Sequence, residues 1–184
     1  MNDDEVRLLG HERAIRSVVA RYCRGIDRMD RELLRSCYHS DATDEHGEFS
    51  GGVDAFLDYA WGELARFSST MHFLGQVLVE FAPGREDAAV AETYAIAFHV
   101  TGDGNPRGNW SAGLRYLDRF ERRPELEFSA LGAWKIARRV VVGEWYRSEP
   151  VERFRPVAPS RHQARRGPDD PIFAMLAGLD ATRR

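Results

Sequence analysis

The chain has 184 residues, 43% of them hydrophobic, which favours one soluble domain with a core large enough to enclose a pocket. Its net charge of −3 argues against a nucleic-acid-binding protein, because the phosphate backbone requires a clustered positive face. The sequence has no apolar run long enough to cross a membrane, and its acidic start, "MNDDEVRLLG", is unlike a signal peptide. We therefore expect a cytoplasmic protein without membrane segments.

The first third of the chain is predicted to be mainly helical. Apolar residues recur at intervals of three and four over residues 4–25, and Gly25 is the expected end of this helix. Asp30 is a suitable N-cap for a short second helix. Residues 41–47 indicate a short strand, and one apolar stripe over residues 53–67 predicts a third helix.

The middle of the chain is predicted to form a sheet. Runs of β-branched and aromatic residues separated by turn signals indicate four long antiparallel strands, at residues 70–81, 88–101, 110–122 and 133–146. Helices followed by a meander of strands predict the α+β class, with three N-terminal helices packed on one face of a curved sheet.

We expect this domain to occupy residues 1–147, followed by a tail over residues 148–184. The tail contains the basic stretch "PSRHQARRGPDD", which we interpret as solvated because acidic residues accompany the arginines. Residues 171–179, "PIFAMLAGL", predict a short terminal helix that docks on the domain or on a neighbouring subunit.

The strand at 88–101 suggests where a pocket lies. Alternation along it places four residues on one face: Thr93, Ala95, Ala97 and His99. Small side chains that face a helix layer leave either close packing or a cavity, and a cavity there is a common small-molecule site. His72 begins the preceding, largely apolar strand, either as a structural residue or as a general base.

Five stretches, in family order over about residues 10–147, resemble the SnoaL-like family of the nuclear transport factor 2-like superfamily. They are "VARYCRGIDRMDRELLRSCYHSDATDEHGEFSG", "STMHFLGQ", "AVAETYAIAFH", "GLRYLDRFERR" and "WKIARRVVVGEW". The resemblance implies a cone-shaped fold, in which helices close against a strongly bent antiparallel sheet around a pocket. It points to the branch that contains scytalone dehydratase, bile acid 7α-dehydratase and a dehydrochlorinase.

The resemblance also implies a catalytic pair. Eliminating members pair an Asp after the first helix with a His that begins the strand after the third, and these positions are Asp27 and His72. A carboxylate beside an imidazole fixes its tautomer and raises its basicity, so that the imidazole can take a proton from carbon. Tyr22, which matches the helix-borne tyrosine of the bile acid dehydratase, can donate a hydrogen bond to the substrate oxygen.

Tyr22 and Asp27 would point about 140° apart in one continuous helix. We therefore expect Gly25 to end the helix, so that Asp27 turns back toward the pocket from the loop beyond.

The resemblance is incomplete on the next strand. The further acid or histidine of the dehydratases falls at Ala97, and His99, two residues on and on the same face, can substitute for it. His46 falls near a pocket tyrosine of scytalone dehydratase. Either His99 or His46 can protonate a leaving hydroxyl. The other candidates for the pocket lining are Ala95, Ala97, Trp110 and Leu114.

Each candidate also has a structural interpretation. Asp27 can cap a turn, His72 can bond a backbone carbonyl, and Tyr22 can belong to the core. His99 lies near a strand end, where it can face solvent, and His46 lies in an acidic cluster that can be a solvated edge. The remaining histidines, His11, His39 and His162, are expected at the surface.

Metal and cofactor sites are not expected. Neither HxH nor HExxH occurs, and Cys23 and Cys37 are too few for a disulfide framework or a zinc site. The leading hypothesis is a cofactor-independent lyase or isomerase of dehydratase type acting on an apolar oxygenated ring compound, such as a polyketide, terpenoid or steroid. The alternatives are a non-catalytic small-molecule-binding module and a scaffold similar to a dioxygenase β-subunit. The exposed outer face of a bent sheet, together with the resemblance, suggests a homo-oligomer, either dimer or trimer.

Overall fold

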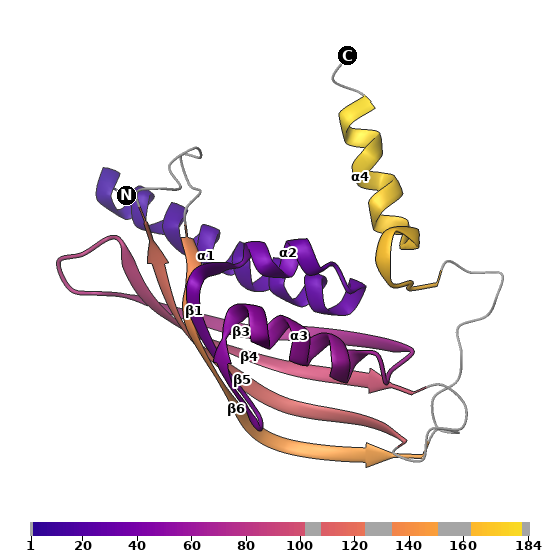
Figure 1. Ribbon diagram of the computed structural model, residues 1–184. Coiled ribbons are helices and arrows are strands. Elements are labelled where there is room, and N and C mark those ends of the chain that lie inside the picture. The colour runs from indigo at the N-terminus through magenta and orange to yellow at the C-terminus, as the bar shows by residue number, and fades with distance from the viewer. Residues whose placement is uncertain (1, 102–107, 124–133, 151–162, 182–184) are drawn as a thin grey trace.

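The computed structural model describes residues 2–101, 108–123, 134–150 and 163–181 (Figure 1). The helices of these residues are α1 (Asp3–Arg28), α2 (Arg31–Ser36), α3 (Val53–Leu64) and α4 (Pro171–Ala181), with a 3₁₀ turn at Gly167–Asp169. The strands are β1 (Tyr38–His46), β2 (Phe49–Gly52), β3 (Ser69–Phe81), β4 (Ala88–Val100), β5 (Asn109–Arg122) and β6 (Trp134–Glu149).

The strands form one sheet in the order β2-β1-β6-β5-β4-β3. Neighbouring strands are antiparallel except β1 and β6, which run parallel. Figure 1 shows the sheet bending strongly, with α1, α2 and α3 on its inner face. The predicted α+β layout and the cone shape implied by the resemblance are confirmed, with β2 and the parallel pairing of β1 as additions.

The sheet carries one buried face, as alternation predicts. In β4 the inward residues are buried and the residues between them are at least partly exposed. The inward row includes Thr93, Ala95, Ala97 and His99, which is the face predicted from the sequence. These small side chains leave room beneath the helices.

Strand β2 was not predicted, because its sequence, "FSGG", is too short and too rich in glycine to carry a strand signal.

The end of α1 differs from the prediction. The helix continues through Gly25 to Arg28 and is terminated by Met29, whose φ of 52° is left-handed. Gly25 serves a different purpose, because a Cβ there would lie 2.9 Å from the backbone nitrogen of Leu34 in α2. Its missing side chain lets α2 pack against α1. Because the helix continues to Arg28, Asp27 lies in its last turn and not in a loop.

The C-terminal part of the chain is attached beside the end of α1. Arg28 donates a hydrogen bond to the Asp170 carboxylate at 2.9 Å, and the Arg24 guanidinium lies 5.9 Å from the ring centre of Phe173 in α4. Strand β6 extends to Glu149, just past the predicted domain end at residue 147. None of the helices in the described ranges has the length and apolar character needed to cross a bilayer.

We predict that Gly25→Ala destabilises the protein by roughly 1–3 kcal/mol through overpacking against α2, although alanine is the better helix former. The matched control is Gly62→Ala in α3, where a Cβ meets nothing within 4 Å. That change is expected to stabilise by up to about 1 kcal/mol. Urea unfolding followed by circular dichroism measures both, and equal gains would show that the contact between α1 and α2 is not tight.

Candidate active site

A pocket lies between the helices and the inner face of the sheet, with a volume of about 280 Å³. Side chains from α1, α3, the end of β1 and strands β3 to β6 line it, and most of them are apolar or aromatic. Three histidines reach it from three strands: His46 from the end of β1, His72 from β3 and His99 from β4. An apolar pocket with a few convergent polar groups is the usual form of a small-molecule site.

Asp27 and His72 are in direct contact, as the resemblance implied. The carboxylate of Asp27 accepts a hydrogen bond from the backbone N–H of His72 at 2.9 Å through Oδ2. Its other oxygen, Oδ1, lies 2.7 Å from Nδ1 of the same histidine. Both side chains are about nine-tenths buried. One carboxylate thus fixes both the strand and the ring, and it joins the last turn of α1 to the start of β3.

The same contact keeps Asp27 ionised. Burial alone would raise the pKa of this carboxyl group, but the hydrogen bonds from His72 outweigh burial and hold the pKa below its ordinary value. A carboxylate at Nδ1 requires that nitrogen to carry the proton, which leaves Nε2 as the acceptor. Because His72 lines the pocket, this acceptor can serve as a base there.

His99 is buried, with only 8% of its surface exposed, so it does not face solvent. Its ring stacks on Trp110 with centres 3.5 Å apart and lies 6.0 Å from the ring of His72. Burial, followed by the nearby His72, lowers the pKa of His99 to about 3. The imidazole is therefore neutral near pH 7, and its Nδ1 has no hydrogen-bond partner.

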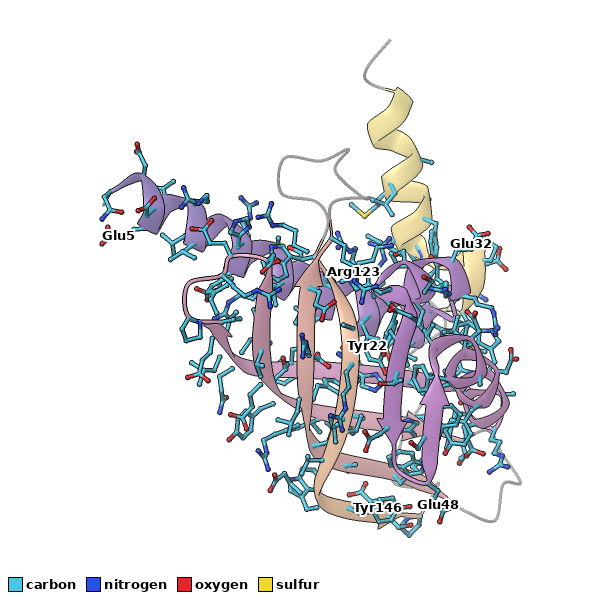
Figure 2. The ribbon with its side chains drawn as sticks, turned by 60° about the vertical axis from the view of Figure 1, so that its left-hand side comes forward. Glu5, Tyr22, Glu32, Glu48, Arg123 and Tyr146 are labelled. Atoms are coloured by element: carbon cyan, nitrogen blue, oxygen red, sulfur yellow. The ribbon has the colours of Figure 1, made fainter. Side chains whose placement is uncertain are left out.

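Tyr22 and His46 lie elsewhere on the pocket wall. Burial raises the pKa of Tyr22, so the hydroxyl keeps its proton and can only donate or accept a hydrogen bond. His46 stacks on Phe56 with ring centres 5.2 Å apart. Figure 2 shows Tyr22 within the body of the molecule.

The acidic cluster around His46 is not uniformly solvated. Asp44 is completely buried, whereas Asp41 is exposed and pairs with Arg123, and Glu45 is partly exposed and pairs with Arg138. The inward position of Asp44 was not predicted from "DATDE".

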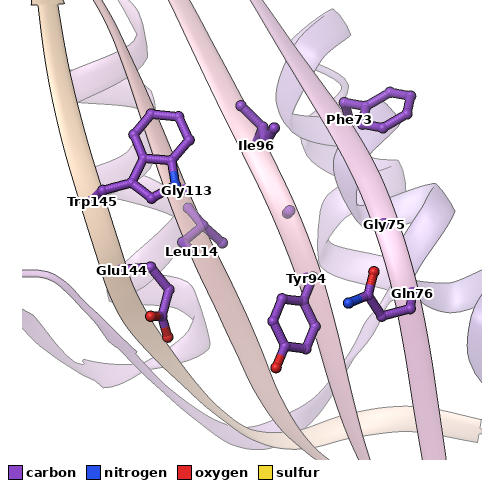
Figure 3. A pocket seen from close by; sticks show the side chains of 10 residues that line it. Phe73, Gly75, Gln76, Tyr94, Ile96, Gly113, Leu114, Glu144 and Trp145 are labelled. Atoms are coloured by element: carbon purple, nitrogen blue, oxygen red, sulfur yellow. The ribbon is translucent and has the colours of Figure 1, made fainter.

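Four of the predicted lining residues reach the pocket, namely His46, Ala97, Trp110 and Leu114. Ala95 does not, although it is buried in the same row. It borders a second hollow of about 310 Å³ on the outer face of the sheet, where Figure 3 shows Phe73, Tyr94 and Trp145.

Two histidines expected at the surface are buried. His11 accepts a hydrogen bond from the Trp134 indole at 3.1 Å, and the Nε2 of His39 lies 3.0 Å from the carbonyl oxygen of Glu121. Both predictions were wrong because neighbouring strands cover these rings and supply polar partners. His162 lies outside the described residues.

A buried ion pair behind the pocket was not predicted from the sequence. Arg139 and Asp118 are both completely buried and form two hydrogen bonds, at 2.7 and 2.6 Å. Strict alternation from Ile136 would place Arg138 inward, but a register shift between β5 and β6 turns Arg139 inward instead. Within the described residues, no group of three or more His, Cys, Asp or Glu side chains is arranged to hold a metal ion.

Comparison with known proteins identifies the fold. The model of the SnoaL-like domain matches residues 7–140. No curated protein sequence matches the chain.

Solved structures with the same fold include a protein assigned as a scytalone dehydratase from Novosphingobium aromaticivorans, with 21% identity, 80% of this chain and 97% of that chain covered, and a TM-score of 0.64. The hexachlorocyclohexane dehydrochlorinase LinA-type3 from Novosphingobium barchaimii has 18% identity, 83% and 99% coverage, and a TM-score of 0.70. A protein of unknown function from Mycobacterium tuberculosis has 23% identity, 100% and 95% coverage, and a TM-score of 0.62. At 18–23% identity, the similarity to these structures establishes only the fold of this chain.

We predict that His99 makes the protein less stable in mild acid. Its pKa is about 3 when folded and 6.5 in its ordinary state, so the unfolded chain takes up a proton first as the pH falls. Stability is therefore lost progressively from about pH 6.5 downward. Replacing His99 with Phe removes this loss, so between pH 7 and pH 5 the variant should lose about 2 kcal/mol less than the wild type. Urea unfolding at both pH values tests this, and equal losses would contradict the neutral assignment.

Proposed function

This chain belongs to the SnoaL-like domain family, and we propose that it is a small-molecule lyase or isomerase in which His72 removes a proton from carbon. The observation that carries the proposal is the two-point contact of the Asp27 carboxylate with His72. A binding module or a scaffold needs no buried carboxylate aimed at a pocket imidazole, so the contact favours an enzyme. The presence of dehydratase-like and dehydrochlorinase structures among the structural neighbours agrees with this class.

The proposed first step uses the Nε2 lone pair of His72. It takes a proton from a carbon next to a carbonyl group, and the C–H electron pair moves toward the carbonyl oxygen. Asp27 stabilises the imidazolium that forms and holds the ring in place, as the orienting member of a base pair. Tyr22 and the neutral His99 can donate hydrogen bonds to the oxygen as it becomes enolate-like.

Two outcomes then complete the reaction. In an elimination the electron pair forms a carbon–carbon double bond and expels hydroxide or halide from the neighbouring carbon. In an isomerisation the proton returns at a different carbon. Both need the same base, and they differ in whether a second group supplies a proton to a leaving atom.

The proposed substrate is an apolar ring compound that carries oxygen. The pocket volume of about 280 Å³ is at the low end for small-molecule sites, so it suits a compact ring system of the polyketide or terpenoid type better than a steroid. Phe56, Phe67 and Trp110 provide flat surfaces for a ring.

We also propose that the protein is a homo-oligomer that assembles through the outer face of the sheet. In the described residues no helix covers this face (Figure 1). Phe73 is 63% exposed and Trp145 is 48% exposed, and both border the outer hollow with Tyr94 (Figure 3). Exposed aromatic patches of this kind are typical of protein interfaces.

Substitution of the pair tests the proposed enzyme. With a panel of cyclic β-hydroxy ketones as probes, formation of the conjugated ketone is followed by ultraviolet absorbance. His72→Gln and Asp27→Asn should each lower the rate by about 10²–10⁴-fold, because the base is lost or takes the wrong tautomer. Glu80→Gln, an exposed change on the same strand, should leave the rate unchanged. Full activity in both site variants would refute the mechanism.

Two neighbouring aromatic residues on β6 test the assembly. Trp145 lies on the outer face over Gly113, whereas Tyr146 points to the inner side, 5.5 Å from Trp110. Trp145→Glu should convert the oligomer to monomers in light scattering after size exclusion, because a buried charge at an interface is costly. Tyr146→Glu should leave the mass unchanged. A wild-type monomer, or an oligomer that persists in Trp145→Glu, would exclude this interface.

A further inference from the structure

A second carboxylate lies beside an imidazole on the far wall of the pocket. Asp44 is completely buried, and its Oδ2 accepts a hydrogen bond from the Tyr38 hydroxyl at 2.6 Å. Its Oδ1 has no hydrogen-bond partner and lies 3.4 Å from Nδ1 of His46, which also has none. Two unpartnered buried atoms that face each other at this distance form a hydrogen-bonded ion pair when the ring carries a proton on each nitrogen.

The charges around Asp44 leave His46 as its partner. Arg139 is the register partner of Asp44 on β6, but its two hydrogen bonds go to Asp118. Burial alone would lower the pKa of Arg139, but the facing Asp118 carboxylate outweighs it and raises the pKa well above its ordinary value. Among the described residues, no Arg or Lys forms an ion pair with Asp44. A buried carboxylate without a directly paired cation is costly, and His46 is the side chain placed to pair with it.

The sheet places the two carboxylate–histidine pairs on opposite sides of the same cavity. His72 lies on β3, at one edge of the sheet, and His46 lies on β1, near the other edge. Both line the pocket, so a ring compound in it lies between them. His99 is next to His72 and is neutral near pH 7, which makes it a poor source of a proton. Of the two histidines that sequence left open as proton donors, His46 has the carboxylate partner.

We propose that Asp44 pairs with His46 and orients its ring, and that His46 is the general acid that protonates the leaving oxygen from the wall opposite His72. This rests on the proposed function above. In the complete step the C–H bond breaks and its proton joins Nε2 of His72, while the electron pair forms the new double bond. The C–O bond breaks, and the oxygen takes its pair and the proton of His46 and leaves as water. His46 is left neutral and His72 protonated.

Solvent restores both histidines. The His46 side chain is 31% exposed, so it can regain a proton from water at the pocket mouth, and His72 loses its proton after the product departs. His72 removes the proton from one wall of the pocket, and His46 protonates the leaving group from the other. We therefore expect the C–H and C–O bonds to break on opposite faces of the ring. Asp44 touches no substrate in this scheme and acts as a positioning residue.

The first test measures the proton on His46 without any substrate. The charged or titratable groups that line the pocket with this ring are Tyr22 on α1, Tyr59 and Glu63 on α3, His72 on β3 and His99 on β4. Asp44 lies beside the ring on β1, and Arg139 lies next to Asp44 on β6. Nitrogen-15 NMR of the imidazole rings should show that Asp44→Asn shifts the Nδ1 signal of His46, because the carboxylate that faces this nitrogen is lost. Glu45→Gln, a change at the adjacent acid that pairs with Arg138 instead, should leave this signal unchanged. An unchanged Nδ1 signal in Asp44→Asn would overturn the pairing.

The second test distinguishes the role of His46 from that of His72 by changing the leaving group of the probe. The probes are matched cyclic ketones that carry either hydroxyl or chloride at the β-carbon, because chloride departs without a proton. His46→Phe, which keeps a ring to stack on Phe56, should slow loss of water at least 100-fold and loss of chloride less than threefold. His72→Gln should slow both. Equal losses for the two probes in His46→Phe would show that its role is not that of an acid.

The two tests also distinguish failure of this inference from failure of the proposed function. If His72→Gln slows neither probe, the proposed function is wrong, and the NMR signal of His46 Nδ1 still decides the Asp44–His46 pairing. If Asp44→Asn does not fold, His46→Phe still decides the role of the acid through the ratio of water loss to chloride loss.

Discussion

The structure depends on one buried cation. The guanidinium of Arg139 lies 3.9 Å from the ring centre of Tyr22 and 4.1 Å from that of Tyr116. It also donates two hydrogen bonds to the Asp118 carboxylate. These contacts join α1 to β5 and β6 at the back of the pocket. A charge in a dry core is tolerated only when its partners are held in place, so the position of α1 on the sheet is tightly constrained. Loss of one partner would leave an uncompensated charge, whereas an apolar replacement of the whole cluster would not.

The placement of α1 explains how one helix serves two walls of the pocket. Tyr22 packs on Arg139 toward the middle of the sheet, and Asp27, in the last turn, reaches the edge strand β3. The two side chains point in different directions on a continuous helix, as the 3.6-residue period requires. They belong to one site because the bent sheet curves around the helix, and Gly25 allows α2 to close over the same turn.

Much of this could be predicted from the sequence, because periodicity and turn residues are local signals. The α+β layout, the inward row on β4 and the candidate pair of Asp27 and His72 followed from spacing and resemblance. The burial of Asp44, the inward position of Arg139 and the packing role of Gly25 did not. Each of these depends on a register shift or on a contact between segments far apart in the chain, and neither leaves a local pattern.

The register shifts of the sheet influence the width of the pocket. Register shifts interrupt the ladders between Tyr38 and Thr43, between Leu74 and Val77, and between Gly113 and Leu114. Bulges of this kind set the local bend of a sheet. The gap between the two histidine-bearing walls is therefore determined by backbone curvature and not by the residues that do chemistry. The gain or loss of a single residue at one shift would widen or narrow the cavity for a new ring size while every reacting group stayed the same.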